Sequence, residues 1–131
     1  MFKILSIAGG GARGIIPTYY LQEIEKQTGK KIYELFDLII GTSTGGILTC
    51  GLGADIKSIN DIQTLYRNEC KNIFKKNILS LITSKYKLEG LVNTLSNQFG
   101  DKLMKDAKTR IITTARDVLG NKNMIMKSYG H

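Results

Sequence analysis

Residues 36–47 read FDLIIGTSTGGI, a short apolar run that leads directly into a glycine-rich turn. We expect a buried strand over Phe36–Ile40 and a helix over Thr44–Gly53. The turn between them has the pattern GxSxG and consists of Gly41, Thr42, Ser43, Thr44 and Gly45. Where this pattern follows a strand and precedes a helix, the serine occupies a strained bend with its hydroxyl above the sheet. The stretch therefore predicts an α/β unit with Ser43 as a candidate nucleophile.

A second glycine-rich turn follows an earlier apolar run. Residues 2–8 are β-prone, and residues 9–14 read GGGARG before a helical pattern begins at Ile15. Consecutive glycines let backbone N–H groups converge on an anion, and the following helix N-terminus adds a favourable dipole. In acyl transfer that anion is the tetrahedral oxyanion, for which one donor is worth about 3 kcal/mol. The candidate residues for an oxyanion site are Gly9, Gly10, Gly11 and the adjacent cation Arg13.

The same hexapeptide also satisfies GxGxxG, so nucleotide binding is an alternative. The dinucleotide fingerprint requires an acid about twenty residues on, at the end of the second strand. That strand ends in Ile40 and Gly41, whereas Asp37 lies near its beginning. A phosphate-binding P-loop requires Lys and Ser or Thr after its last glycine, but isoleucines follow Gly14. The P-loop interpretation is excluded, and dinucleotide binding stays a secondary hypothesis.

The remaining pattern predicts further helices and a hairpin. The helix over Ile15–Gln27 should turn one stripe inward, formed by Leu21, Ile24 and Tyr20. Ser58 and Asp61 have the spacing of a capping arrangement before the next helix. The later elements are a helix over Lys87–Phe99 and two strands, Arg110–Arg116 and Met124–Tyr129. This order predicts a three-layer α/β/α sandwich with a mainly parallel sheet, formed by residues 1–131 as one partial domain.

Composition and cysteine usage favour a cytoplasmic globular protein. The chain has 131 residues, of which 42% are hydrophobic and 23% charged, so disordered, collagen-like and disulfide-stapled classes are excluded. Cys50 and Cys70 lie in apolar helical patterns without CxxC spacing, which predicts free buried thiols in a reducing compartment. With His131 as the single histidine we expect no metal site. Neither a signal peptide nor a membrane span is expected.

The charge is distributed unevenly along the chain. Residues 1–65 carry six basic and six acidic side chains, and residues 66–131 carry thirteen basic and five acidic, so the whole excess of +8 lies in the second half. Near an anionic membrane surface each lysine is worth about 1 kcal/mol. The mixture of basic and apolar residues over 71–87 suits such docking. The alternative is that these lysines are exposed and keep the protein soluble. We expect no nucleic-acid partner.

The two glycine-rich turns together resemble the motifs of the patatin-like phospholipase family. AGGGARG over residues 8–14 is similar to its oxyanion loop and GTSTGG over residues 41–46 to its nucleophile elbow, and the similarity continues through Leu88–Phe99 and Arg110–Thr114. The resemblance implies a lipid ester substrate, such as a phospholipid, and no metal or organic cofactor. It implies that Ser43 is the catalytic serine. It also assigns the oxyanion site to Gly9, Gly10, Gly11 and Arg13.

The general base is the departure from this family. Patatin-like enzymes use a Ser-Asp dyad whose aspartate belongs to a later Asp-Gly-Gly or Asp-Gly-Ala segment, and this sequence contains neither. His131 is the final residue, and Asp117 fits a hairpin turn better than a base. We therefore expect a domain that stops before its last part and shows little hydrolysis alone. It is either a fragment of a longer protein or a naturally short chain that supplies half a site, and a partner chain that supplies the missing part is one source of the base. The alternative is a non-catalytic lipid- or protein-binding module that retains the fold.

Overall fold

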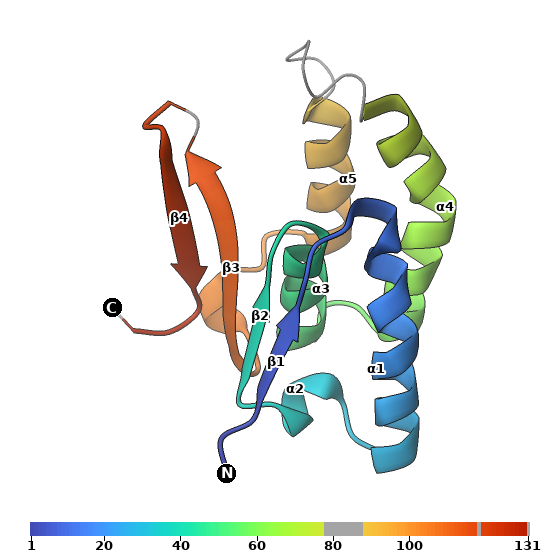
Figure 1. Cartoon of the computed structure of the whole chain (residues 1–131), viewed down its shortest axis with the longest axis vertical. Coiled ribbons are helices and arrows are strands. Elements are labelled where there is room, and N and C mark those ends of the chain that lie inside the picture. The colour runs from blue at the N-terminus through green and yellow to red at the C-terminus, as the bar shows by residue number, and fades with distance from the viewer. Residues whose placement is uncertain (78–87, 118, 131) are drawn as a thin grey trace.

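The computed structural model of the chain describes residues 1–77, 88–117 and 119–130, with the side chains of 69–77, 88–91 and 94 left undescribed (Figure 1). In this part of the chain a single sheet has the strand order β1-β2-β3-β4. The strands are β1 (Ile4–Ile7), β2 (Leu38–Gly41), β3 (Arg110–Asp117) and β4 (Lys122–Lys127). β1, β2 and β3 are parallel, and β4 returns antiparallel to β3 as a hairpin. The α/β class and the mainly parallel sheet are confirmed.

The described helices cover one face of the sheet. Helix α3 (Thr44–Gly53) packs on β1, β2 and β3. Ile39 and Ile111 are neighbours in the register and both are fully buried on this side. Because the parallel strands follow one another in sheet order, right-handed crossovers place their connecting helices on the same face. On the other face Ile4 and Ile125 are exposed, so the described residues supply one helical layer of the expected sandwich.

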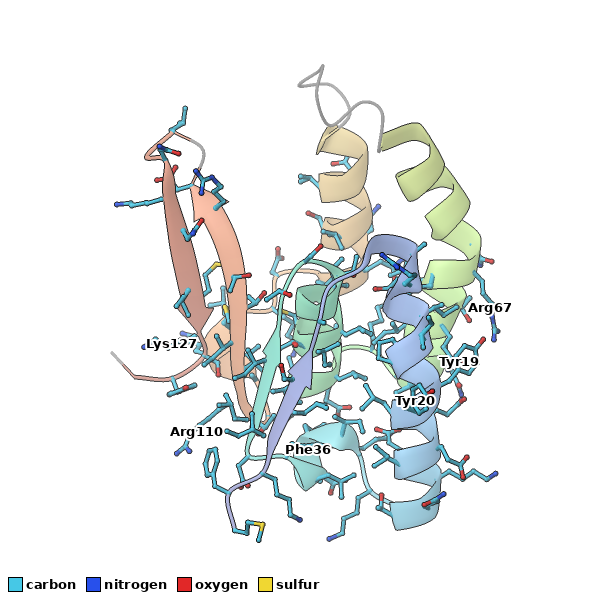
Figure 2. The ribbon with its side chains drawn as sticks, in the orientation of Figure 1. Tyr19, Tyr20, Phe36, Arg67, Arg110 and Lys127 are labelled. Atoms are coloured by element: carbon cyan, nitrogen blue, oxygen red, sulfur yellow. The ribbon has the colours of Figure 1, made fainter. Side chains whose placement is uncertain are left out.

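Helix α1 (Ile15–Thr28) starts at its predicted residue and continues one residue past its predicted end. Leu21 is 3% exposed and Ile24 packs against the core, as its apolar stripe requires. Tyr20 was expected to face inward, and this was wrong: it is 70% exposed. Figure 2 shows Tyr20 on the outer side of α1 near Tyr19, whose hydroxyl accepts a hydrogen bond from Arg67. Successive residues lie about 100° apart on a helix, so burying Leu21 turns Tyr20 towards solvent.

The other helices surround α1 and α3. They are α2 (Ile32–Leu35), α4 (Ile59–Asn77) and α5 (Leu88–Phe99), with short 3-10 turns η1 (Gly11–Gly14) and η3 (Met104–Asp106). The capping arrangement before α4 is confirmed, because Ser58 and Asp61 exchange side-chain and backbone hydrogen bonds. α4 packs along α1 and buries Ile59, Ile62 and Tyr66 in the core. None of the described helices is both long and apolar enough to traverse a bilayer.

Candidate functional site

The GxSxG turn connects β2 to α3 through a strained residue. Ser43 has φ 54° and ψ −127°, in a region that residues other than glycine rarely adopt. Such a backbone costs about 1–3 kcal/mol and persists only where the surrounding structure enforces it. Ser43 and Thr42 are exposed, whereas Gly41, Thr44 and Gly45 are buried. The bend therefore exposes the Ser43 side chain to solvent, while the residues on both sides of the bend are buried.

The close approach of three main-chain segments enforces this bend. A Cβ atom on Gly41 would collide with the carbonyl group of Gly45, and one on Gly45 would collide with the carbonyl oxygen of Ile7. The end of β1, the end of β2 and the start of α3 are thus in direct backbone contact. Only glycine can occupy these two positions without moving the main chain.

The second glycine-rich turn lies against the first. Figure 1 shows the β1–α1 and β2–α3 connections at the same end of the sheet. A Cβ atom on Gly9 would lie 2.7 Å from the Ser43 Cβ and 3.4 Å from its Oγ. The Gly9 amide donates a hydrogen bond to the Thr42 Oγ1 at 3.2 Å, and the Gly10 amide donates to the Thr44 Oγ1 at 3.3 Å. The structure therefore brings together the two turns that the sequence singled out.

The last part of the glycine-rich loop leads into α1. Gly11 has φ 58°, and the Arg13 amide donates to the Gly10 carbonyl oxygen at 3.2 Å. The Arg13 side chain is exposed at this turn. Within the described residues it makes no hydrogen bond or ion pair, so its guanidinium is accessible to an anionic group.

Tyr66 of α4 supports both turns and was not foreseen as part of the site. Its ring fills the space beside Gly14, where a Cβ atom would collide with it. Its hydroxyl donates to the Thr44 carbonyl oxygen at 3.5 Å. The sequence marks Tyr66 only as one residue of an apolar helical stripe. Nothing in that pattern indicates which elements the stripe contacts.

An apolar cavity of about 440 Å³ opens beside Ser43. It lies between α3, α5 and the β3–β4 hairpin, and its wall includes Ile47, Cys50, Leu95, Phe99, Met104 and Met126. Cys50 is a free, half-buried thiol, and burial raises its pKa. The Cys70 side chain lies outside the described residues. The cavity offers an apolar chain a place to lie next to the Ser43 hydroxyl.

No acid or imidazole is hydrogen-bonded to the Ser43 hydroxyl among the described residues. Four aspartate carboxylates accept hydrogen bonds from backbone amides outside the two glycine-rich turns; they are Asp37, Asp61, Asp106 and Asp117. Asp117 accepts from the Gly120 amide at 2.9 Å, so it stabilises the β3–β4 turn. His131 lies outside the described residues. The described side chains also contain no cluster of three or more His, Cys, Asp or Glu that could hold a metal ion.

Comparison with known proteins places these motifs in a family. The model of the patatin-like phospholipase family matches residues 5–128. The chain is 43% identical over 76 residues to "Phospholipase A I" of Arabidopsis thaliana, an alignment that covers 58% of the chain and 6% of that protein. It is 29% identical to "cGAMP-activated phospholipase" of Pseudomonas aeruginosa, over 99% of the chain and 40% of the relative.

A third relative, "Probable inactive patatin-3-Kuras 1" of Solanum tuberosum, is 30% identical over 95% of the chain and 37% of its own length. The chain thus spans well under two thirds of each of these three relatives. The family match nevertheless includes both glycine-rich turns and every described strand except the first residue of β1. The chain belongs to the patatin-like phospholipase family.

Proposed function

We propose that this chain carries the nucleophile and the oxyanion site of a lipid acyl hydrolase of the phospholipase A type. The observation that carries the proposal is the position of Ser43, a strained and exposed serine in contact with the glycine-rich loop and at the wall of an apolar cavity. Residues with strained backbone cluster at active sites and ligand clamps. Family membership supports the same chemistry.

In the proposed reaction the Ser43 Oγ attacks the carbonyl carbon of a lipid ester. A base takes the hydroxyl proton, and the carbonyl oxygen becomes an oxyanion held by the amides of Gly9, Gly10 and Gly11 beside Arg13. Collapse of the intermediate breaks the ester C–O bond, and the base passes the proton to the leaving oxygen, which departs as the alcohol. Water, deprotonated by the same base, then attacks the acyl-enzyme, the fatty acid leaves, and the proton returns to the Ser43 Oγ. The acyl chain would occupy the cavity beside Ser43, whose mostly apolar wall fits a hydrocarbon better than a polar ligand.

The described residues do not supply an evident base. A serine hydroxyl reacts slowly at neutral pH unless a neighbouring group accepts its proton. Of the described aspartates, Asp37 and Asp55 lie nearest in sequence to the GxSxG turn. The Asp37 carboxylate accepts a hydrogen bond from the Lys3 amide, and neither aspartate is hydrogen-bonded to Ser43. We therefore propose that these 131 residues alone hydrolyse lipid esters slowly or not at all. A partner chain that contributes an aspartate beside Ser43 would restore turnover.

Fluorophosphonate labelling combined with an ester hydrolysis assay tests this proposal. We expect the wild-type chain to be labelled, Ser43→Ala to be unlabelled, and the exposed-serine control Ser6→Ala to be labelled like wild type. Phospholipid hydrolysis by the purified chain should stay near the background rate. An unlabelled wild type would overturn the nucleophile assignment. Fast, Ser43-dependent release of fatty acid would instead show that the base lies within the chain.

A non-catalytic lipid-binding module is the second candidate. It is favoured by the Ser43 hydroxyl having no basic partner among the described residues, and by a relative whose name describes it as inactive. The excess of basic residues in the second half suits an anionic bilayer. Co-sedimentation with vesicles tests the membrane docking on which this candidate depends: binding should rise with anionic lipid content, and binding indifferent to lipid charge would remove the docking hypothesis. The fluorophosphonate labelling and hydrolysis assay separates the module from the hydrolase, because a non-catalytic module should be labelled at Ser43 weakly or not at all.

A further inference from the structure

We propose that Thr42 and Thr44 are positioning residues whose hydroxyls hold the glycine-rich loop against the nucleophile turn. The two threonines flank Ser43, and each accepts a hydrogen bond from one loop amide: Gly9 to Thr42 and Gly10 to Thr44. This inference deepens the proposed function and rests on it, because the loop that the threonines hold is the proposed oxyanion site.

The sheet geometry explains why the Gly9 and Gly10 amides donate to side chains and not to backbone carbonyl groups. The β1–β2 ladder ends at the pair Ile7 and Gly41, and one more main-chain bond follows, from the Thr42 amide to the Ile7 carbonyl oxygen at 3.3 Å. Beyond it both chains turn away from the sheet, so the ladder offers no further backbone acceptor. A threonine hydroxyl can accept with either lone pair and still donate its own hydrogen, which makes it a suitable substitute.

The two hydrogen bonds are the described polar links between residues 8–11 and the GxSxG turn. Their placement matters because Gly9 lies in contact with Ser43, so a shift of the loop directly changes the distance from its amides to the reacting hydroxyl. Donors aimed in advance at the developing charge are what an oxyanion site needs. The threonines therefore fix the orientation of two proposed donors before substrate binds.

The length of these bonds is compatible with turnover. At 3.2 and 3.3 Å they are longer than the usual 2.9–3.0 Å of an amide donor to an oxygen acceptor. An oxyanion is a stronger acceptor than a neutral hydroxyl, so it can take over the same hydrogens. The Thr42 and Thr44 oxygens act as placeholders that keep the amides in position while the site is empty of substrate.

Tyr66 holds the buried half of this arrangement from the opposite side. Thr44 is 6% exposed, and its carbonyl oxygen accepts from the Tyr66 hydroxyl while its side chain accepts from Gly10. The Tyr66 ring also packs beside Gly14, where the loop enters α1. One residue of α4 therefore contacts both ends of the arrangement, and Thr44 cannot shift without disturbing that contact.

The test uses paired substitutions that separate the hydroxyl from the side-chain shape. Thr42→Val and Thr44→Val remove the acceptor and keep the branched shape, and Thr42→Ser and Thr44→Ser restore the acceptor. Thr28→Val is the matched control, because the Thr28 Oγ1 accepts the Lys30 amide at 3.3 Å at the far end of α1. Amide hydrogen exchange at Gly9 and Gly10 measures the bonds, and the rate of fluorophosphonate labelling measures the reactivity of Ser43.

We expect exchange at Gly9 to accelerate in Thr42→Val and exchange at Gly10 to accelerate in Thr44→Val. Labelling of Ser43 should slow about tenfold or more in either valine variant, because donors that are no longer held lose their alignment. The serine variants should recover most of the wild-type rate, and Thr28→Val should match wild type. Thr42 is exposed, so its pair of variants gives a result even where Thr44→Val fails to fold.

The outcomes separate this inference from the proposed function. Unchanged exchange at Gly9 in Thr42→Val overturns the inference, because the hydroxyl then does not hold the amide. Faster exchange with an unchanged labelling rate also overturns it, because the bond then does not position the site. A wild-type chain that is never labelled overturns the proposed function instead, and the exchange data alone then decide whether the threonines hold the loop.

Discussion

The nucleophile turn and the β3–β4 hairpin are built in opposite ways. Around the turn, the main chains of β1, β2 and α3 are in direct contact at Gly41 and Gly45, with no side chain between them. The neighbouring Ile39 is fully buried. Along the hairpin every residue of β4 is exposed, including Ile125 at 67%. The comparison shows that an exposed side chain, that of Ser43, can stand on a tightly constrained backbone. Surface exposure of Ser43 therefore does not indicate a tolerant region.

The largest expected loss in the free energy of unfolding comes from adding one methyl group at the nucleophile turn. Gly45→Ala places its Cβ into the Ile7 carbonyl group, which belongs to the sheet and cannot yield. We expect a loss of more than about 4 kcal/mol in the free energy of unfolding, a large part of a domain's stability. Urea denaturation followed by circular dichroism measures it, and loss of a cooperative transition counts as the same result.

Gly120→Ala is the matched substitution in the hairpin. Its Cβ would meet the carboxylate end of Asp117, a side chain that can rotate away at the cost of its hydrogen bond from the Gly120 amide. The expected cost is within about 1 kcal/mol, as for most surface changes. Equal losses in the two variants would contradict the distinction between the regions.

A smaller effect is expected from removing side-chain atoms at each region. Ile39 is 0% exposed between the sheet and α3, so Ile39→Ala leaves a cavity and should cost about 2–5 kcal/mol. Ile125 is 67% exposed on β4, and Ile125→Ala should cost less than about 0.5 kcal/mol. The urea midpoints of both variants measure the difference. A cost above about 2 kcal/mol at Ile125 would show that this face is covered by another surface in solution.

The features that the sequence predicted are those decided by neighbours along the chain. The strand before Gly41, the helix after Ser43 and the exchange between Ser58 and Asp61 each depend on a few adjacent residues, so local pattern sufficed. Membership of the family followed from two such patterns in order. Local chemistry therefore identified the elements and the motifs.

The features that the sequence pattern did not predict depend on contacts between segments that are distant along the chain. The threonine hydroxyls meet the glycine amides across 33 and 34 residues, and Tyr66 meets Thr44 across 22. The exposure of Tyr20 depends on which side of α1 contacts α4. No spacing rule along one chain encodes these contacts, because they follow from how strands and helices are placed against one another.

The smallest expected change in the free energy of unfolding is at the exposed helix cap that precedes α4. The Ser58 hydroxyl donates to the Asp61 carboxylate at 2.7 Å and accepts from the Asp61 amide at 3.1 Å. Ser58→Ala removes both bonds and should lower the free energy of unfolding by about 1 kcal/mol at pH 7, as the loss of a helix cap does.

The pH dependence of that loss tests its origin. Hydrogen bonds from the Ser58 side chain and backbone lower the pKa of Asp61 below its ordinary value of 3.8. A carboxylate with a lowered pKa contributes stability above its unfolded pKa, and the contribution is lost as the pH falls through the folded pKa. The difference between wild type and Ser58→Ala should therefore shrink from pH 7 to pH 3, measured by urea denaturation at each pH. A difference that stays constant would mean that the amide bond to the serine oxygen, which does not titrate, carries the whole effect of the cap.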